Sequence, residues 1–259
     1  MGAFPSDFFA FPLNAIFALM WIIGCVALWR NCRKTLLVKF LLSPFATLLS
    51  IFCCIALCLV IGITGRREWA SSWVAVVLFF LLQTVVLFVL MRGWRMPTAT
   101  GARLGAIRWR FVFLHFGLLL ALGSSFWGAP DTQTMRLKAE MGHPVNEAIY
   151  MDGRGAWLPY EITLKDFQMD TYENGTPSDF RAVVSIDGED MCLRVNHPYS
   201  KGFNEDIYLI DYDKYASSYC ILQIVSEPWK YGTVAGIVLM MLGALLLFIN
   251  GPVKRYRDE

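Results

Sequence analysis

Charged residues are scarce in this sequence, and histidines are scarcer still. Asp, Glu, Lys and Arg make up 17% of the 259 residues, whereas hydrophobic residues make up 56%. Soluble domains carry about 25% charged residues, so the composition excludes an ordinary soluble fold. The chain has only three histidines. The scarcity of charge indicates a membrane protein, and the scarcity of histidine leaves few candidates for metal or acid–base chemistry.

Several common functional patterns are also missing. The sequence has no internal repeat, no low-complexity tract and no Gly-rich phosphate loop. Its apolar runs contain no Asp or Glu, and little that is polar beyond Asn14 and Gln83. Proton relays within membranes depend on chains of acidic groups and histidines. The sequence therefore disfavours a proton transporter, and we expect no nucleic-acid partner.

Five uncharged apolar stretches are long enough to cross a bilayer as helices. They are residues 11–29, 40–64, 70–91, 111–128 and 231–251. The first is not a secretory signal, because no basic residue precedes it, Asp7 does, and the run is too long. We expect a polytopic α-helical membrane protein with about five transmembrane helices. Four belong to a membrane domain, residues 1–128, and the last begins a segment, residues 231–259, that ends in a basic tail.

The basic residues predict the orientation of these helices. They form three clusters: Arg30, Arg33, Lys34 and Lys39; Arg92, Arg95, Arg103, Arg108 and Arg110; and Lys254, Arg255 and Arg257. All three lie in the cytoplasm only if the N-terminus is outside and the C-terminus inside. The short Arg66–Arg67 loop is then a mild exception. Residues 129–230 are predicted to be external.

The external segment differs from the rest in charge and in pattern. It holds 9 basic and 17 acidic residues, a net charge of −8, against +10 for the remainder. Alternation in YEITLKDFQMDTY, RAVVSI, MCLRVN and YCILQIV is typical of strands, and ENGTPSD and DGED of turns. We expect one extracytoplasmic, mostly-β domain, a small sandwich or barrel of five to seven strands. Residues 129–156 lack a clear period and are expected to be a linker or partly helical.

The seven cysteines carry no redox motif. Cys25, Cys53, Cys54 and Cys58 lie in apolar spans, where cysteine usually packs as a small hydrophobe. Cys32 is expected to be a free cytoplasmic thiol. Cys192 and Cys220 lie in the external segment, where a disulfide can form, so we expect a structural bridge between them or none.

His115 lies within the fourth apolar run, RWRFVFLHFGLLLALGSSFWG. An ionisable group in hydrocarbon costs roughly 2.5 kcal/mol or more unless it faces a partner, a cavity or a cofactor. If the helix enters the bilayer near Arg110, His115 lies about 7 to 8 Å below the cytoplasmic boundary. Phe111, Leu118 and Leu122 share its helix face as an apolar wall.

The opposite side of that helix carries small residues. Gly117, Ala121 and Ser125 form a row that permits close helix packing, and Gly232 and Gly236 form a GxxxG pair in the last span. One face of the fourth helix is therefore expected to pack on another helix, while the face with His115 meets a bulkier group.

Two interpretations of His115 follow from the residues alone. It forms a structural hydrogen bond to another helix, or it ligates haem iron, because neutral imidazole is a standard axial ligand and the apolar wall suits a porphyrin. A bis-histidine haem b would take its second imidazole from another subunit, since no other span contains one. The rival functions are a membrane cytochrome b-type electron-transfer subunit, and a non-haem assembly or sensor protein in which His115 is structural.

Long stretches of the chain resemble the ResB (CcsB) family of cytochrome c biogenesis proteins. They are LPYEITLKDFQMDTYENGTPSDFRAVVSIDGED, LRVNHPYSKGF and ILQIVSEPWKYGTVAGIVLMMLGALLLFI. HFGLLLALG, which contains His115, is similar to the family's histidine-bearing third span, so the first span here is extra. The resemblance covers roughly residues 40 to 251.

This resemblance implies system II cytochrome c maturation in the bacterial inner membrane. A ResB and ResC (CcsB and CcsA) pair passes haem outward and attaches it to CXXCH motifs, and a histidine from each half ligates haem in the membrane. Only His115 occupies such a position here. The tryptophan-rich haem signature of the ResC half is absent, which implies an accessory subunit of a haem lyase. Implied partners are a ResC/CcsA-type protein, apocytochrome c and a thioredoxin-like reductant.

His197 is a further candidate, because RVNHPYSKG matches the family's VNHP. Asn-His-Pro between two strands is, however, a turn signal, and an imidazole there more often bonds the loop than ligates a metal. His143 is treated as a surface residue. Trp127 is expected to be an interfacial aromatic anchor, with an outer haem platform as the alternative.

Overall fold

The chain forms two compact units in the computed structural model. The structure describes residues 4–94, 107–173, 177–213 and 218–250. The membrane domain comprises Met1–Pro130 and Trp229–Glu259, and the β domain comprises Asp131–Pro228. Some residues used for the sequence predictions lie outside the described residues: Arg95, Arg103, Lys254, Arg255, Arg257 and the turn residues 174–176.

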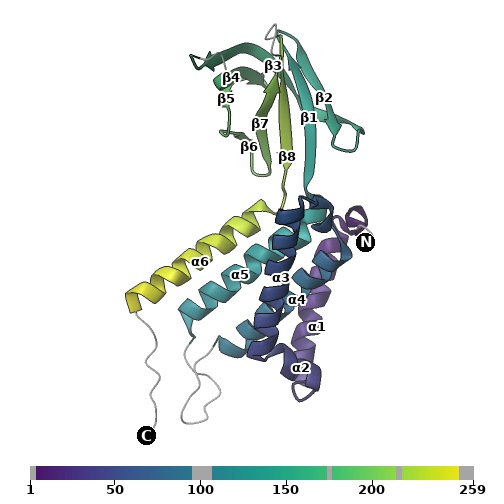
Figure 1. Ribbon diagram of the computed structural model, residues 1–259, viewed down its shortest axis with the longest axis vertical. Helices are drawn as coiled ribbons and strands as arrows, with labels where there is room; N and C mark the ends of the chain where they lie inside the picture. The colour runs from purple at the N-terminus through teal and green to yellow at the C-terminus, as the bar shows by residue number, and fades with distance from the viewer. Residues whose placement is uncertain (1–3, 95–106, 174–176, 214–217, 251–259) are drawn as a thin grey trace. The chain divides into compact units, whose positions relative to one another are not determined.

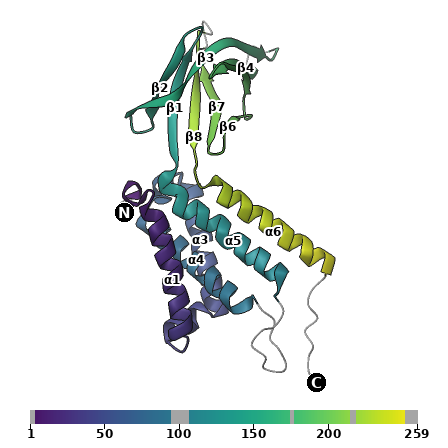
Figure 2. The same cartoon turned by 180° about the vertical axis from the view of Figure 1, so that it is seen from behind.

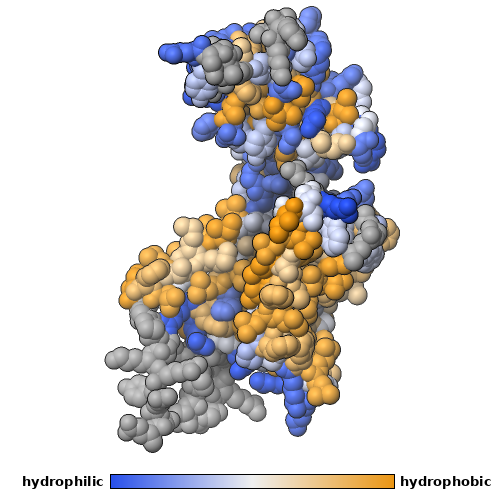
Figure 3. Space-filling view, viewed as in Figure 1, coloured by the Kyte–Doolittle hydropathy of each residue, from blue (hydrophilic) through white to orange (hydrophobic). Residues whose placement is uncertain are grey.

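Five helices in the described part of the membrane domain are long and apolar enough to cross a bilayer. They are α1 (Leu13–Asn31), α3 (Pro44–Thr64), α4 (Trp73–Gly93), α5 (Trp109–Gly128) and α6 (Lys230–Asn250). Hydrophobic side chains cover the visible faces of these helices (Figure 3). The chain is a polytopic helical membrane protein with a β domain, as the composition predicts.

Shorter helices lie between and beside the long ones. The helix α2 (Leu36–Leu41) joins α1 to α3 and was not expected from the sequence. Three 3-10 helices, η1 (Ser6–Phe9), η2 (Arg67–Trp69) and η3 (Ala129–Asp131), lie before α1, between α3 and α4, and after α5.

Capping interactions determine where α3 begins and ends and where α4 begins. The hydroxyl of Ser43 accepts a hydrogen bond from the Ala46 amide at 3.1 Å, and Pro44 occupies the first helical position. Ser72 caps α4 in the same way, 3.3 Å from the Ala75 amide. Gly65, with φ of +66°, ends α3 in the left-handed conformation that glycine adopts without steric cost. The two helices are therefore separated by a capped turn.

The helices α5 and α6 lie side by side (Figures 1 and 2), with their backbones in direct contact. A Cβ atom on Gly236 would lie 2.5 Å from the Ala121 amide nitrogen, and one on Gly117 would lie 2.7 Å from the Gly236 carbonyl oxygen. The hydroxyls of Ser125 and Thr233 are 3.2 Å apart across the same pair. The small-residue spacing correctly predicted this contact, which leaves the His115 side of α5 for other neighbours.

The β domain is one eight-stranded antiparallel sheet within the described residues. The strands are β1 (Gln133–Glu140), β2 (Pro144–Tyr150), β3 (Gly155–Thr171), β4 (Pro177–Ile186), β5 (Glu189–Arg194), β6 (Tyr199–Lys201), β7 (Glu205–Tyr212) and β8 (Tyr219–Ser226). Their order is β5-β4-β3-β2-β1-β8-β7-β6. Successive strands are neighbours except β5 and β6, which form the two edges, and β8 pairs with β1. The sheet therefore consists of two meanders, β1 to β5 and β6 to β8, joined by the pairing of β1 with β8.

Two expectations for this domain were wrong. The domain has eight strands rather than five to seven, and residues 129–156 contain β1 and β2 rather than a linker or a partly helical segment. In β1 the buried residues Met135, Leu137 and Ala139 alternate with exposed ones. That pattern is short and ends in alanine, and its stability comes from pairing with β2 and β8, which lies more than 80 residues later.

The sheet curls so that distant strands meet across its inner face. The rings of Phe167 on β3 and Tyr212 on β7 stack with centroids 4.9 Å apart. The hydroxyl of Tyr160 on β3 donates to the carboxylate of Glu205 on β7. Leu222 on β8 is among the residues that are fully buried in the common core, and burying such a side chain contributes about 1.5–3 kcal/mol. The sheet thus encloses its own core, as a small barrel does.

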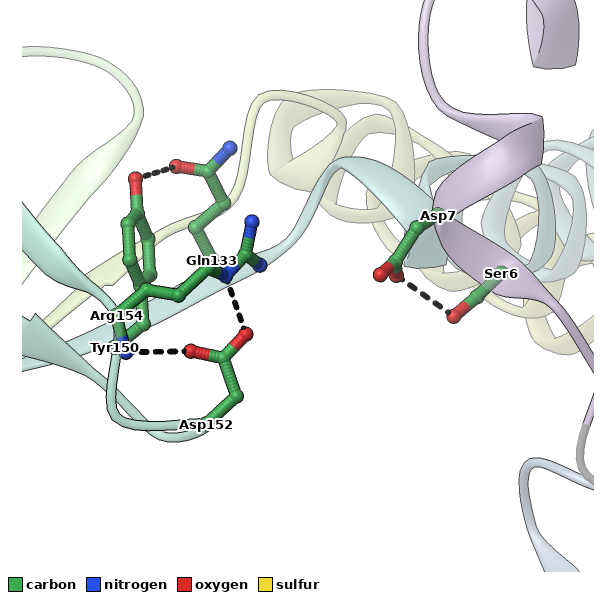
Figure 4. Close-up of polar contacts among 6 residues, drawn as sticks. All are labelled: Ser6, Asp7, Gln133, Tyr150, Asp152 and Arg154. Carbon is green, nitrogen blue, oxygen red and sulfur yellow. Dashed lines mark hydrogen bonds and ion pairs between the residues drawn. The ribbon is translucent and has the colours of Figure 1, made fainter.

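A polar turn between β2 and β3 illustrates how the domain pairs its charges (Figure 4). The carboxylate of Asp152 accepts hydrogen bonds from the Arg154 amide at 3.0 Å and from its guanidinium Nε at 2.6 Å. These two bonds hold the pKa of Asp152 below its ordinary value. The Tyr150 hydroxyl donates to Gln133 at 3.3 Å beside them.

Candidate functional site

His115 lies in the second turn of α5 and is half-buried. Its Nδ1 lies 2.9 Å from the carbonyl oxygen of Phe111, one turn earlier. A carbonyl oxygen only accepts, so Nδ1 carries the proton and donates it in this bond. In the neutral imidazole, Nε2 then keeps a free lone pair. No hydrogen bond to Nε2 occurs within the described residues.

The Phe111 side chain holds the imidazole in place. Its ring stacks on His115 with centroids 3.9 Å apart and planes inclined by 25°. Phe111 in turn lies against the backbone of α4, because a Cβ atom on Gly93 would lie 2.6 Å from Phe111 Cε1. Gly93 is therefore the small residue that lets the ring pack closely, and α4 fixes the aromatic support of the imidazole.

Arg108 lies on the other side of the Phe111 ring, toward the start of α5. Its guanidinium carbon lies 4.9 Å from the centre of the Phe111 ring, in a cation–π contact. Its Nη1 donates to the Gly93 carbonyl at 3.4 Å. Arg108 is half-buried, and no carboxylate pairs with it in the part of the chain that the structure describes. Arg108, Phe111 and His115 thus form a guanidinium–ring–imidazole row along one face of the helix.

The structure divides the apolar wall predicted from the helical repeat. Phe111 contacts the imidazole, whereas Leu118 and Leu122 lie further along α5 and are half-buried. Leu122 lines a cavity of about 890 Å³ between α1, α4 and α5, whose other lining residues include Trp21, Phe80 and Trp127. Leu122 therefore belongs to an aromatic cavity nearer the end of the helix.

Two side chains of α4 and α5 have buried polar atoms without hydrogen-bond partners in the described structure. Trp127 packs against Trp21 and Phe80, and its Nε1 is buried with no hydrogen-bond partner in the described structure. The Gln83 side chain, 1% exposed on α4, likewise lacks partners for both amide atoms. Leaving such a group unsatisfied costs about 1–3 kcal/mol. Trp127 is thus packed against other aromatic residues near the end of α5, and its role as an interfacial anchor stays a prediction.

The other histidine candidate, His197, lies in the turn that joins β5 to β6. Its amide donates to the Arg194 carbonyl at 3.1 Å, and the preceding Asn196 has φ of +59°. The imidazole is exposed. The described residues contain no cluster of three or more His, Cys, Asp or Glu positioned to bind a metal ion. This arrangement agrees with the turn predicted from Asn-His-Pro.

The two cysteines of the β domain are not bridged. Cys192 is exposed on β5, and Cys220 is fully buried on β8, with both thiols free. Burial raises the pKa of the Cys220 thiol to about 12. A buried, protonated thiol is a poor nucleophile, so Cys220 is a core residue.

Sequence reasoning missed Arg108 and Gly93 as parts of this site. Arg108 precedes His115 by seven residues, or two helical turns, and this spacing was available in the sequence. Gly93 gave no such signal, because its contact with Phe111 joins two helices.

The comparisons with known proteins bear on the segment that carries this site. The profile of the ResB-like family matches residues 95–223, a range that includes α5 and most of the β domain. No curated protein matches the sequence. A solved structure described as cytochrome c heme lyase CcmF is similar at 17% identity with a TM-score of 0.41. The match covers 90% of this chain and 38% of that one, and at this level it says nothing about function. From the match to residues 95–223, the chain belongs to the ResB-like family.

Proposed function

We propose that this protein holds haem within the membrane during cytochrome c maturation, with His115 as an axial ligand of the iron. One observation carries the proposal: Nδ1 of His115 donates to the Phe111 carbonyl, which leaves Nε2 free. Ligating histidines commonly donate their second ring nitrogen in this way, because the bond fixes the ring and raises the basicity of the ligating nitrogen.

The surrounding residues favour a ligand role in two further ways. Phe111 stacks on the imidazole and limits its rotation, and Gly93 allows α4 to support that ring. The half-buried apolar face that continues to Leu118 suits a porphyrin. Haem b would arrive as cargo, and this chain would bind and orient it without changing its covalent structure.

The second axial ligand would come from another protein. His143 and His197 lie in the β domain, so His115 is the single histidine of the transmembrane helices. A ResC/CcsA-type, tryptophan-rich membrane protein would supply the other imidazole and form the thioether bonds of a system II pathway. This chain would then be an accessory, non-catalytic subunit of a haem lyase complex.

In the proposed orientation the β domain lies outside the bacterial inner membrane and the C-terminus lies in the cytoplasm. The domain and its flanks carry a net charge of −8, which would attract basic segments of an apocytochrome. The apocytochrome thiols must be reduced before haem attachment. Cys220 is buried and Cys192 is unpaired, so a thioredoxin-like partner would provide the reductant.

The test is the haem absorption spectrum of the purified complex with and without His115→Ala. Loss of bound haem in His115→Ala, with haem retained in the matched control His197→Ala, is the expected result. Unchanged haem in His115→Ala would overturn the proposal and leave an assembly or sensor role. A variant that loses haem but keeps normal covalent cytochrome c would favour the cytochrome b-type electron carrier.

A further inference from the structure

We infer that Arg108 binds a haem propionate and so directs the carboxylate edge of the haem toward the first turn of α5. This inference rests on the proposed function, because it places a second contact on the same ligand. Its evidence is separate from that for His115: it concerns an arginine whose charge has no counter-ion in the described structure.

The environment of Arg108 favours the binding of an anion. The guanidinium has five N–H donors, of which one makes a long bond of 3.4 Å to the Gly93 carbonyl. One face of the group is covered by the Phe111 ring. A partly desolvated cation is costly unless a charged partner compensates it.

The neighbouring sequence offers no such partner. Residues 92–110 contain five arginines and no Asp or Glu, and the other basic segment, residues 30–39, also has no acidic residue. Asp7 and Glu68 lie before α1 and between α3 and α4, at the ends of these helices opposite to the first turn of α5 in the predicted topology. Asp258 and Glu259, at the end of the sequence, lie outside the described residues. Within the described residues no acidic side chain pairs with Arg108, and the anion that we propose for it is a carboxylate of the bound haem.

The spacing within the row fits a molecule that is ligated at its centre and charged at one edge. Arg108 and His115 are seven residues apart, which places them on nearly the same helix face with a rise of about 10 Å. Phe111 lies between them and contacts both. A porphyrin held by His115 through its iron would extend beside Phe111, and its propionates are its only charged groups. Carboxylates match the planar fork of arginine, which can bind both oxygens.

A phospholipid headgroup offers the same anionic chemistry to an arginine at the membrane boundary. The two sources differ in one respect, because a lipid contact does not depend on whether the haem carries carboxylates. Haem b and its dimethyl ester, which lacks both charges, therefore distinguish them.

The experiment measures the affinity of the full-length chain, in complex with its membrane partner, for haem b and for haem b dimethyl ester. In the unmodified protein, haem b should bind about tenfold more tightly than the ester. Arg108→Ala should abolish this difference by weakening haem b binding and leaving ester binding unchanged. Arg108→Lys should retain part of it, since lysine keeps the charge but loses the fork.

A matched control is available on α1 and the loop that follows it. The Arg33 guanidinium lies 4.5 Å from the centre of the Trp29 ring, the same type of contact without a histidine beyond it. Arg33→Ala should leave both affinities unchanged.

Two results would overturn the inference. One is an equal loss of affinity for haem b and for the ester in Arg108→Ala, which would indicate a lipid or structural contact. The other is no loss for either compound. A failure of the proposed function is distinguishable, because His115→Ala would then bind both compounds as tightly as the unmodified protein does.

Discussion

The membrane domain and the β domain differ in whether their charged and polar side chains have partners. The β domain pairs its charges internally, through Lys138–Glu140, Arg154–Asp152, Lys165–Asp190, Arg194–Asp179 and Lys201–Asp187. In the described membrane domain, Arg108 lacks a carboxylate, and Gln83 and Trp127 lack hydrogen-bond partners. The difference fits the proposed function, in which the membrane domain receives groups from other molecules while the β domain satisfies its own charged groups.

The two units also differ in how much of their apolar surface is exposed. The β domain buries a continuous apolar core, although Trp157 and Phe203 are exposed. On α3, by contrast, the side chains of Phe45, Leu48 and Phe52 are all more than 60% exposed. Lipid and a partner protein would cover such a surface. The space-filling view shows this contrast in hydropathy between helices and strands (Figure 3).

The largest expected effect is on cytochrome c itself. His115→Ala should reduce covalently attached haem in c-type cytochromes to background, because it removes the ligand that this chain contributes. Haem staining of membranes measures it, with a b-type respiratory enzyme as the internal control. The proposed delivery role would be wrong if c-type cytochromes stayed at normal levels.

A core substitution tests whether the β domain is complete on its own. Leu222→Ala should lower the unfolding free energy of this domain by about 2–5 kcal/mol, since the side chain is fully buried. Haem binding at His115 should be unaffected in the same preparation. Thermal unfolding and a haem titration measure the two quantities, and a parallel loss of haem would show that the units are not independent.

A glycine substitution tests how α5 is fixed within the membrane domain. Gly236→Ala should destabilise the domain by about 1–3 kcal/mol, because the new Cβ would lie 2.5 Å from backbone atoms of α5 that cannot move aside. Gly24→Ala on α1 is the matched control, since no atom lies within 4 Å of its Cβ position. Thermal unfolding in detergent should separate the two variants. Equal melting temperatures would contradict the close contact.

The smallest expected effect concerns the exposed ion pair between Asp152 and Arg154, which Figure 4 shows. The pKa of Asp152 is lowered in the folded protein, so its charged form stabilises the fold above the ordinary pKa of 3.8. This contribution is lost as the pH falls through the lowered folded value. Asp152→Asn should therefore be slightly less stable than the unmodified protein at pH 7, and the difference should vanish in strong acid. An acid titration of stability measures it, and a difference that persisted at low pH would exclude the ion pair as its cause.

Much of the fold could be predicted because a bilayer imposes simple rules. Long uncharged runs indicated the five helices, and alternation indicated β3, β4, β5 and β8. The helix α2 was missed because it is only six residues long and Lys39 interrupts its apolar residues. The strands β1, β2, β6 and β7 were not identified from the sequence, and each is paired with a neighbouring strand in the sheet. Within the described sheet, only the pairing of β1 with β8 joins strands that are far apart in the sequence.

The site was predictable only in part. His115 stood out because no other transmembrane segment contains a histidine. The contact between Gly93 and Phe111, and the unpartnered amide of Gln83, depend on how helices pack. No periodicity within a single helix reports such contacts.

The most direct measurement is pulsed EPR of ferric haem in the complex, with ¹⁵N-histidine incorporated only into this chain. Ligation by His115 predicts a ¹⁵N hyperfine coupling to the iron, present in His197→Ala and absent in His115→Ala. A haem whose strongly coupled nitrogens are all ¹⁴N, with its spectrum unchanged in His115→Ala, would contradict the assignment of His115 as the haem ligand.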